Sequence, residues 1–184
     1  YFVSAGGRQG SLILAVNALL MTLYTLFSYF MDGFAYAGEA LCGKYYGAGD
    51  SVSFRSLVRR LYVWGAAMTV VFTVLYAVGG QDFLGLLTSD THVVRAAMRY
   101  LPWAVAIPVC GVMAFIYDGV FIGVTATRGM LVSSALATAL FFVLYLSLSA
   151  TLANDGLWIA FLAYLACRGA VQGVLVHKSK FMSV

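Results

Sequence analysis

Two acidic residues, Asp32 and Glu39, lie inside a long apolar stretch that would otherwise suit a membrane helix. They are seven residues apart, about two turns of an α-helix, so their carboxyl groups share one face. The same face, within roughly 60° of Asp32 on a 3.6-residue period, also carries Asn17, Thr25, Ser28, Tyr36 and Gly43. Because an ionisable group facing lipid is costly, we expect this stripe to face other helices or a water-filled cavity. The alternative is that the acids pair with a neighbouring helix for packing alone.

Asp118 and Arg168 are two further ionisable residues inside apolar segments. Asp32 and Asp118 are each followed by glycine and an apolar turn, so the two acids would lie at similar depth if their helices adjoin. Two carboxyls that share a poorly hydrated site do not both ionise readily, which suits a proton carrier. The same pair, with hydroxyl and carbonyl oxygens, suits Na⁺, and the sequence does not choose between the two ions. Arg168 is able to pair with either acid or to form a purely structural ion pair.

Other residues that often carry chemistry give weaker signals. Cys42, Cys110 and Cys167 lie in apolar runs without CxxC spacing, which is typical of buried free thiols. His92 and His177 have no second ligand nearby in the sequence, so the sequence predicts no metal site and no cofactor.

An enzymatic alternative rests on two short motifs. Gly47-Ala-Gly-Asp50 has the GxGD form, and Tyr117-Asp118 the YD form, of intramembrane aspartyl proteases, in which two aspartates activate water. The order of the motifs is reversed relative to that family, and no PAL tripeptide follows. We therefore predict no catalytic residue and no enzyme activity. The protease remains the alternative function, together with a structural membrane subunit that transports nothing.

The composition indicates what kind of structure must position these residues. Of the 184 residues, 62% are hydrophobic and only 10% are charged, and mean hydropathy is +0.92. Soluble domains carry about 25% charged residues, so the chain is an integral membrane protein whose main partner is the lipid bilayer. The basic residues lie at the ends of apolar runs rather than in one patch, so the net charge of +4 does not indicate nucleic-acid binding.

The apolar runs predict an all-α polytopic protein that forms a single transmembrane domain over residues 1–184. The expected spans are 12–43, 61–80, 101–127, 129–153 and 157–176. The first exceeds the roughly 20 residues that a bilayer needs, so it should tilt, protrude or kink near Gly33. Pro102 and Pro108 should bend the third span, and Asn154 to Gly156 reads as a tight turn. The opening residues read as the tail of a helix, so we expect a fragment of a larger protein.

Positive charges predict the orientation in the membrane, because cytoplasmic loops carry an excess of Lys and Arg. One side holds seven such residues, namely Lys44, Arg55, Arg59, Arg60, Arg128, Lys178 and Lys180. The other side holds three, Arg8, Arg95 and Arg99. The count places the Asp50 loop, the Arg128 loop and the C-terminus in the cytoplasm.

Four strings resemble a known family. DGFAYAGEALCGKYYGAGD, RYLPW, DGVFIGVTATRGM and DGLWIAFLAYLACRGAVQG resemble the C-terminal half of the MATE multidrug and toxic compound extrusion transporters, with the DNA-damage-inducible F branch nearest. The resemblance implies a six-helix C-terminal lobe, made of the end of helix seven and helices eight to twelve. It also implies a bacterial inner-membrane protein with a cytoplasmic C-terminus, whose N-terminal six-helix lobe lies outside this chain.

The resemblance further implies export of amphipathic or cationic compounds in exchange for H⁺ or Na⁺ by alternating access. Asp118 falls in helix ten, where sodium-linked branches use an aspartate, whereas this branch most often uses one in helix one. We therefore take Asp32, Glu39 and Asp118 as candidates for ion coupling. The candidates for the substrate cavity are Asn17, Ser28, Phe34, Tyr36 and Arg168. On its own, one lobe is not expected to transport.

Overall fold

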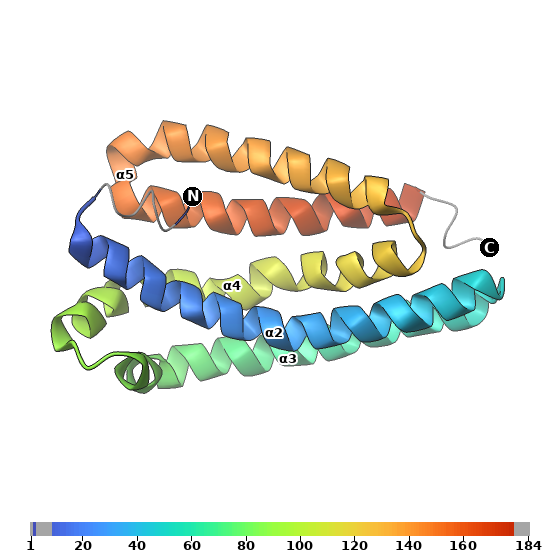
Figure 1. Ribbon diagram of the computed structural model, residues 1–184, viewed down its shortest axis with the longest axis horizontal. Coiled ribbons are helices and arrows are strands. Elements are labelled where there is room, and N and C mark those ends of the chain that lie inside the picture. Colours follow the sequence, from blue (N-terminus) through green and yellow to red (C-terminus); the bar gives the residue numbers. More distant parts are fainter. Residues whose placement is uncertain (1, 3–8, 179–184) are drawn as a thin grey trace.

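The computed structural model describes residues 2 and 9–178 and places almost all of them in four long helices (Figure 1). These helices are α2 (Ser11–Gly47), α3 (Ser51–Leu87), α4 (Thr91–Gly123) and α5 (Thr127–Lys178). All four are long and apolar enough to cross a membrane, and no strand occurs in the part of the chain that is described. The expected all-α membrane fold is therefore confirmed.

Helix α5 is two antiparallel arms joined at a sharp reversal. Ala153 has φ 47° and ψ −117°, a left-handed region that breaks the helix between residues 127–152, the first arm, and residues 154–178, the second arm. Figure 1 shows the two arms running back along each other. Each arm has about 25 residues, enough to cross a bilayer. The chain therefore reverses one residue before the tight turn that was expected at Asn154 to Gly156, and those three residues begin the second arm instead.

Buried side-chain hydrogen bonds hold the reversal of α5 against α2. The amide groups of Asn17 and Asn154 bond to each other in both directions, at 2.7 and 3.0 Å. The indole N–H of Trp158 also donates to Asn17 Oδ1 at 3.0 Å, and all three side chains are buried. Trp103 of α4 donates to Asp155 Oδ1 at 2.8 Å. Buried polar groups are stable only when they are paired in this way. These side chains therefore determine where the reversal of α5 packs against α2 and α4.

Aspartates cap two of the helices. The carboxylate of Asp50 accepts a hydrogen bond from the backbone N–H of Ser53 at 3.0 Å and so caps α3. Asp90 accepts from the N–H groups of His92 and Val93 at 2.9 and 3.3 Å at the start of α4. Each cap satisfies backbone donors that have no partner within the helix.

Helix α4 is bent, whereas α2 is not broken. Pro102 and Pro108 lie within α4, where each removes a backbone donor and crowds the preceding turn. Figure 1 shows the first turns of α4 at an angle to the rest of that helix. Helix α2, by contrast, continues unbroken past Gly33 to Gly47, so its excess length is accommodated without a break at Gly33.

Helices α2 and α4 approach each other backbone to backbone. A Cβ atom added to Gly119 would lie 2.2 Å from the carbonyl oxygen of Ala35, and one added to Gly123 would lie 2.5 Å from that of Glu39. Gly43 faces Gly123 in the same way, at 3.0 Å. Glycines four residues apart on α4 therefore allow the two backbones to touch, as in small-xxx-small membrane interfaces.

The glycines in and just after α2 differ in their surroundings. Gly38 and Gly43 lie in the contact with α4, whereas Gly33, Gly47 and Gly49 have open space where a side chain would be. The main core lies inside the bundle and is built mostly of Leu, Phe, Tyr, Trp and Ala from all four helices. Many Val and Leu side chains remain exposed on the outside, which is the surface expected for helices in lipid.

Candidate functional site

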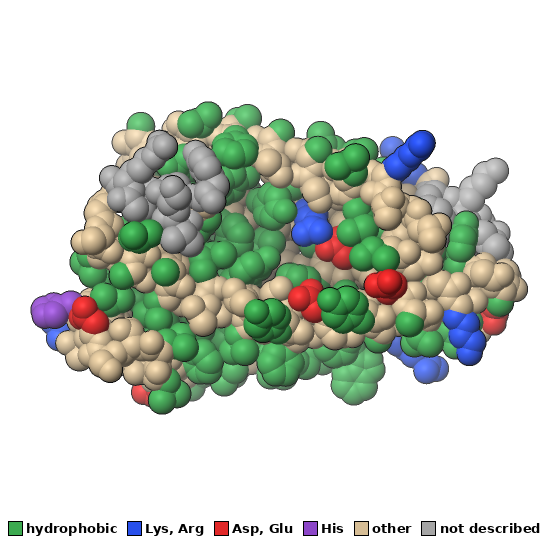
Figure 2. Space-filling model, in the orientation of Figure 1, with side chains coloured by type: hydrophobic (Ala, Val, Ile, Leu, Met, Phe, Trp, Pro, Cys, Tyr) green, Lys and Arg blue, Asp and Glu red, His purple; other side chains and the backbone are tan. Residues whose placement is uncertain are grey.

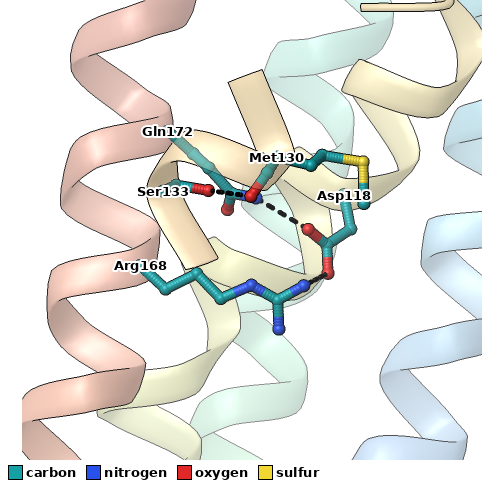
Figure 3. Close-up of polar contacts among 5 residues, drawn as sticks. All are labelled: Asp118, Met130, Ser133, Arg168 and Gln172. Carbon is teal, nitrogen blue, oxygen red and sulfur yellow. Dashed lines mark hydrogen bonds and ion pairs between the residues drawn. The ribbon is translucent and has the colours of Figure 1, made fainter. Parts of the chain in front are cut away.

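An ion pair between helices joins Asp118 of α4 to the second arm of α5 (Figure 3). Arg168 Nη2 donates to Asp118 Oδ2 at 2.5 Å, and Gln172 Nε2 donates to Asp118 Oδ1 at 2.7 Å. Both carboxylate oxygens are thus engaged by donors from one helix face. Arg168 and Gln172 are four residues apart, which places them on the same side of α5.

This contact is largely withdrawn from the surface. The side chains of Arg168 and Asp118 are 21% and 17% exposed, and Gln172 is fully buried. Arg168 Nε and Gln172 Oε1 are buried without a hydrogen-bond partner among the described residues. Gln172 was missed by sequence reasoning, although its position one turn after Arg168 was the available signal.

Asp32 of α2 belongs to the same site. It lies within electrostatic range of Asp118, and the Tyr24 hydroxyl lies within range of Asp32, Asp118, Arg168 and Tyr164. Asp32 is half-buried, and no hydrogen bond or ion pair to its carboxylate is formed within the described residues. We call Asp32, Asp118 and Arg168 the acid–arginine cluster.

One side of the molecule is hollowed. Figure 2 shows acidic side chains and one basic side chain together near mid-length on this side, beside a depression lined by hydrophobic groups. Aromatic rings contribute apolar surface beside the cluster. The ring of Phe161 contacts Tyr24 edge-on with centroids 5.2 Å apart, and it stacks on Tyr164 at 6.5 Å.

The other predicted site residues are spread over different environments. Asn17 is fully buried and bonded to Asn154 and Trp158, so it does not line an open cavity, contrary to the expectation. Its amide instead holds the reversal of α5 against α2. Tyr36 is 69% exposed.

Three of the predicted site residues are intermediate in solvent exposure. Ser28, Phe34 and Glu39 are half-buried, and Phe34 packs against the main core. The backbone oxygen of Glu39 lies at the glycine contact with α4. The structure therefore brings together Asp32, Asp118 and Arg168, and it leaves Asn17 and Tyr36 outside that group.

Asp50 has a structural environment. Its carboxylate caps α3, and hydrogen bonds from the hydroxyl and N–H of Ser53 lower the pKa of Asp50 below that of an ordinary carboxyl. Asp118 is held by Arg168 and Gln172 on a different element. Two aspartates that share one water, as a protease needs, are not provided by this pair.

Metal and thiol chemistry have no support in the described residues. No group of three or more His, Cys, Asp or Glu side chains comes close enough there to hold a metal ion. Cys42, Cys110 and Cys167 are free thiols, with Cys42 fully buried.

Comparison with known proteins gives one family and several relatives. The model of the MatE family matches residues 2–148. The chain is 43% identical over 164 residues to DNA damage-inducible protein F of Escherichia coli (strain K12), covering 89% of this chain and 36% of that protein. It is 26% identical to Protein DETOXIFICATION 42 of Arabidopsis thaliana, covering 91% of this chain and 33% of that protein.

A second plant relative extends the same pattern. Protein DETOXIFICATION 45, chloroplastic, of Arabidopsis thaliana is 22% identical, covering 90% of this chain and 30% of that protein. The chain thus spans about a third of the length of the curated relatives it matches. No solved structure matches the chain.

Proposed function

The chain belongs to the MatE family, and on that premise we propose that it is part of a secondary active multidrug efflux transporter. The transporter would export amphipathic or cationic compounds in exchange for H⁺ or Na⁺ by alternating access. Its partners would be the lipid bilayer, the transported compound and an N-terminal six-helix lobe. The matched relatives are about three times as long as this chain. In this proposal the chain therefore forms only one part of the transporter.

The observation that carries the proposal is the acid–arginine cluster inside a bundle of long apolar helices. With both aspartates ionised, the cluster has one net negative charge, since Arg168 balances only one acid. Ionisable groups inside a membrane are costly and commonly mark ion or substrate pathways. A site with one surplus negative charge attracts a proton, a monovalent cation or a cationic compound.

The aromatic surface beside the cluster supports the proposed substrate class. Tyr24 and Tyr164 are half-buried residues close to the charged groups, and the rings of both contact the buried ring of Phe161. A cationic amphiphile gains from both parts, because rings attract cations electrostatically and bury apolar surface. Phe34 and Tyr36 remain proposed contacts for parts of a larger substrate.

The distribution of basic residues supports the proposed orientation. Figure 2 shows Lys and Arg side chains gathered mainly at one end of the molecule. That end carries Lys44 at the end of α2, Arg55 at the start of α3 and Arg128 at the start of α5. We therefore propose a multi-pass protein of the bacterial inner membrane with this end and the C-terminus in the cytoplasm.

The test uses the full-length protein that contains this chain, expressed in a drug-sensitive bacterial strain. Efflux of a fluorescent cationic dye would be followed after the cells are energised. We expect the wild type to export the dye, and Asp32→Asn and Asp118→Asn to reduce export to the level of the empty vector. Asp82→Asn is the matched control, because Asp82 is an exposed acid near the end of α3.

The outcomes separate the parts of the proposal. A wild type that exports no compound of this class would refute the transporter. A wild type that exports the dye while both variants remain fully active would refute the role of the cluster. Loss of export in Asp82→Asn as well would mean that removing any carboxylate is harmful. That result would refute a specific role of Asp32 and Asp118 in export.

A further inference from the structure

Each carboxylate oxygen of Asp118 already accepts a hydrogen bond from a side-chain donor of α5 in this structure. One carboxylate oxygen accepts from the guanidinium of Arg168, and the other accepts from the amide of Gln172. Hard cations such as sodium need several oxygen ligands around them. Gln172 turns its N–H₂ group, not its oxygen, toward Asp118, because a carboxylate accepts only from donors. The groups around Asp118 therefore suit a bound cationic side chain rather than a bound metal ion.

Arg168 is a permanent cation in this position. A guanidinium stays protonated in proteins, and its contact with Asp118 lies within a poorly hydrated part of the bundle. A second cation that approached Asp118 would meet this charge at contact distance. Repulsion between like charges is far stronger in such surroundings than in water.

We propose that Arg168 acts as a tethered counter-ion, which takes the cation position at Asp118 and thereby excludes sodium from it. The proposal rests on the proposed transport function, and it excludes sodium as the coupling ion at Asp118. It leaves Asp32 as the acid of the cluster that is open to an exchangeable cation, since no described residue bonds to its carboxylate. Arg168 is a positioning and specificity residue here.

The test measures sodium binding on the purified full-length protein, so that it does not depend on transport. Binding of radioactive sodium would be measured at constant ionic strength with choline as the replacement cation. We expect the wild type and Asp118→Asn to bind the same amount of sodium, because the wild type binds none at Asp118. Arg168→Gln removes the charge, and we expect it to raise sodium affinity at Asp118 at least about tenfold. Adding Asp118→Asn to that variant should abolish the gain.

Arg168→Lys is the matched control because it keeps the positive charge. It should exclude sodium as the wild type does, which a purely structural role of Arg168 would not predict. If Arg168→Gln does not fold, the wild type and Asp118→Asn still decide, because sodium binding at Asp118 in the presence of Arg168 would overturn the proposal. A folded Arg168→Gln protein that binds no more sodium than the wild type would overturn it as well.

These results stand apart from those of the efflux assay. A wild type that exports no dye refutes the transporter, whatever sodium does. A wild type that exports dye and binds sodium at Asp118 refutes only the role of Arg168.

Discussion

Replacing Gly119 by alanine should separate α2 from α4 at their closest contact. The new methyl carbon would lie 2.2 Å from the oxygen of Ala35 and 2.9 Å from its carbonyl carbon and Cα. These are backbone atoms of a helix, so they cannot rotate away as a side chain would. The same change at Gly33 meets nothing within 4 Å. The two substitutions are chemically identical and differ only in the space available.

The size of the effect follows from that geometry. An ordinary contact needs a little over 3 Å, so the helices must part by about 1 Å, and a gap of that size forfeits up to about half of the dispersion energy of each contact. Overpacking of this kind costs about 1–3 kcal/mol. Alanine in place of glycine within a helix returns about 0.5–1 kcal/mol. We expect Gly119→Ala to lose about 1–2 kcal/mol net, and Gly33→Ala to lose none.

The assay is unfolding of the purified full-length protein by sodium dodecyl sulfate in mixed micelles, followed by tryptophan fluorescence. Gly119→Ala should unfold at a lower detergent fraction than the wild type, and Gly33→Ala at the same or a higher one. Equal stability of the two variants would refute the reasoning, because it would mean that the backbones of α2 and α4 do not touch at Gly119.

Two further predictions concern hydrogen bonds at the helix ends. Asn17→Leu leaves the amide of Asn154 and the indole N–H of Trp158 without their buried partner, so it should cost about 1–3 kcal/mol in the same assay, and wild-type stability would contradict it. The hydrogen bonds from Ser53 lower the pKa of Asp50, so the stability they add is present above the ordinary carboxyl pKa and is lost as pH falls through the lowered value. Asp50→Asn should therefore flatten the fall in thermal stability between about pH 5 and pH 2, and an unchanged slope would contradict this.

The helices of this protein could be predicted because their signals are local. Apolar runs, the aspartates that precede α3 and α4, and the turn residues after Ala153 each act within a few positions of the chain. Bounds were less accurate where amphipathic ends continue the helices. Helix α3 continues to Leu87, beyond the expected span at 61–80, because backbone hydrogen bonding does not stop where hydropathy falls.

The partners of the polar residues could not be predicted in the same way. Asn17 and Asp32 share one face of α2 by periodicity, yet the first bonds to Asn154 and the second lies near Asp118. Helical periodicity predicts which residues share a face of a helix. It does not predict which neighbouring helix contacts that face at each position along the helix. Likewise, the sequence allowed Arg168 to pair with either acid. The orientation of the second arm of α5 places the guanidinium against Asp118.

The glycine contact and the acid–arginine cluster depend on each other. Ala35 lies one turn after Asp32 on α2, and Gly119 directly follows Asp118 on α4. The point where the backbones touch is therefore the point that brings the two acids together. Two acids resist such an approach because their charges repel, and the approach must be stabilised by other contacts. Close packing through Gly119 and the positive charge of Arg168 supply that stabilisation from two sides. A larger residue at position 119 should consequently disturb the cluster as well as the fold.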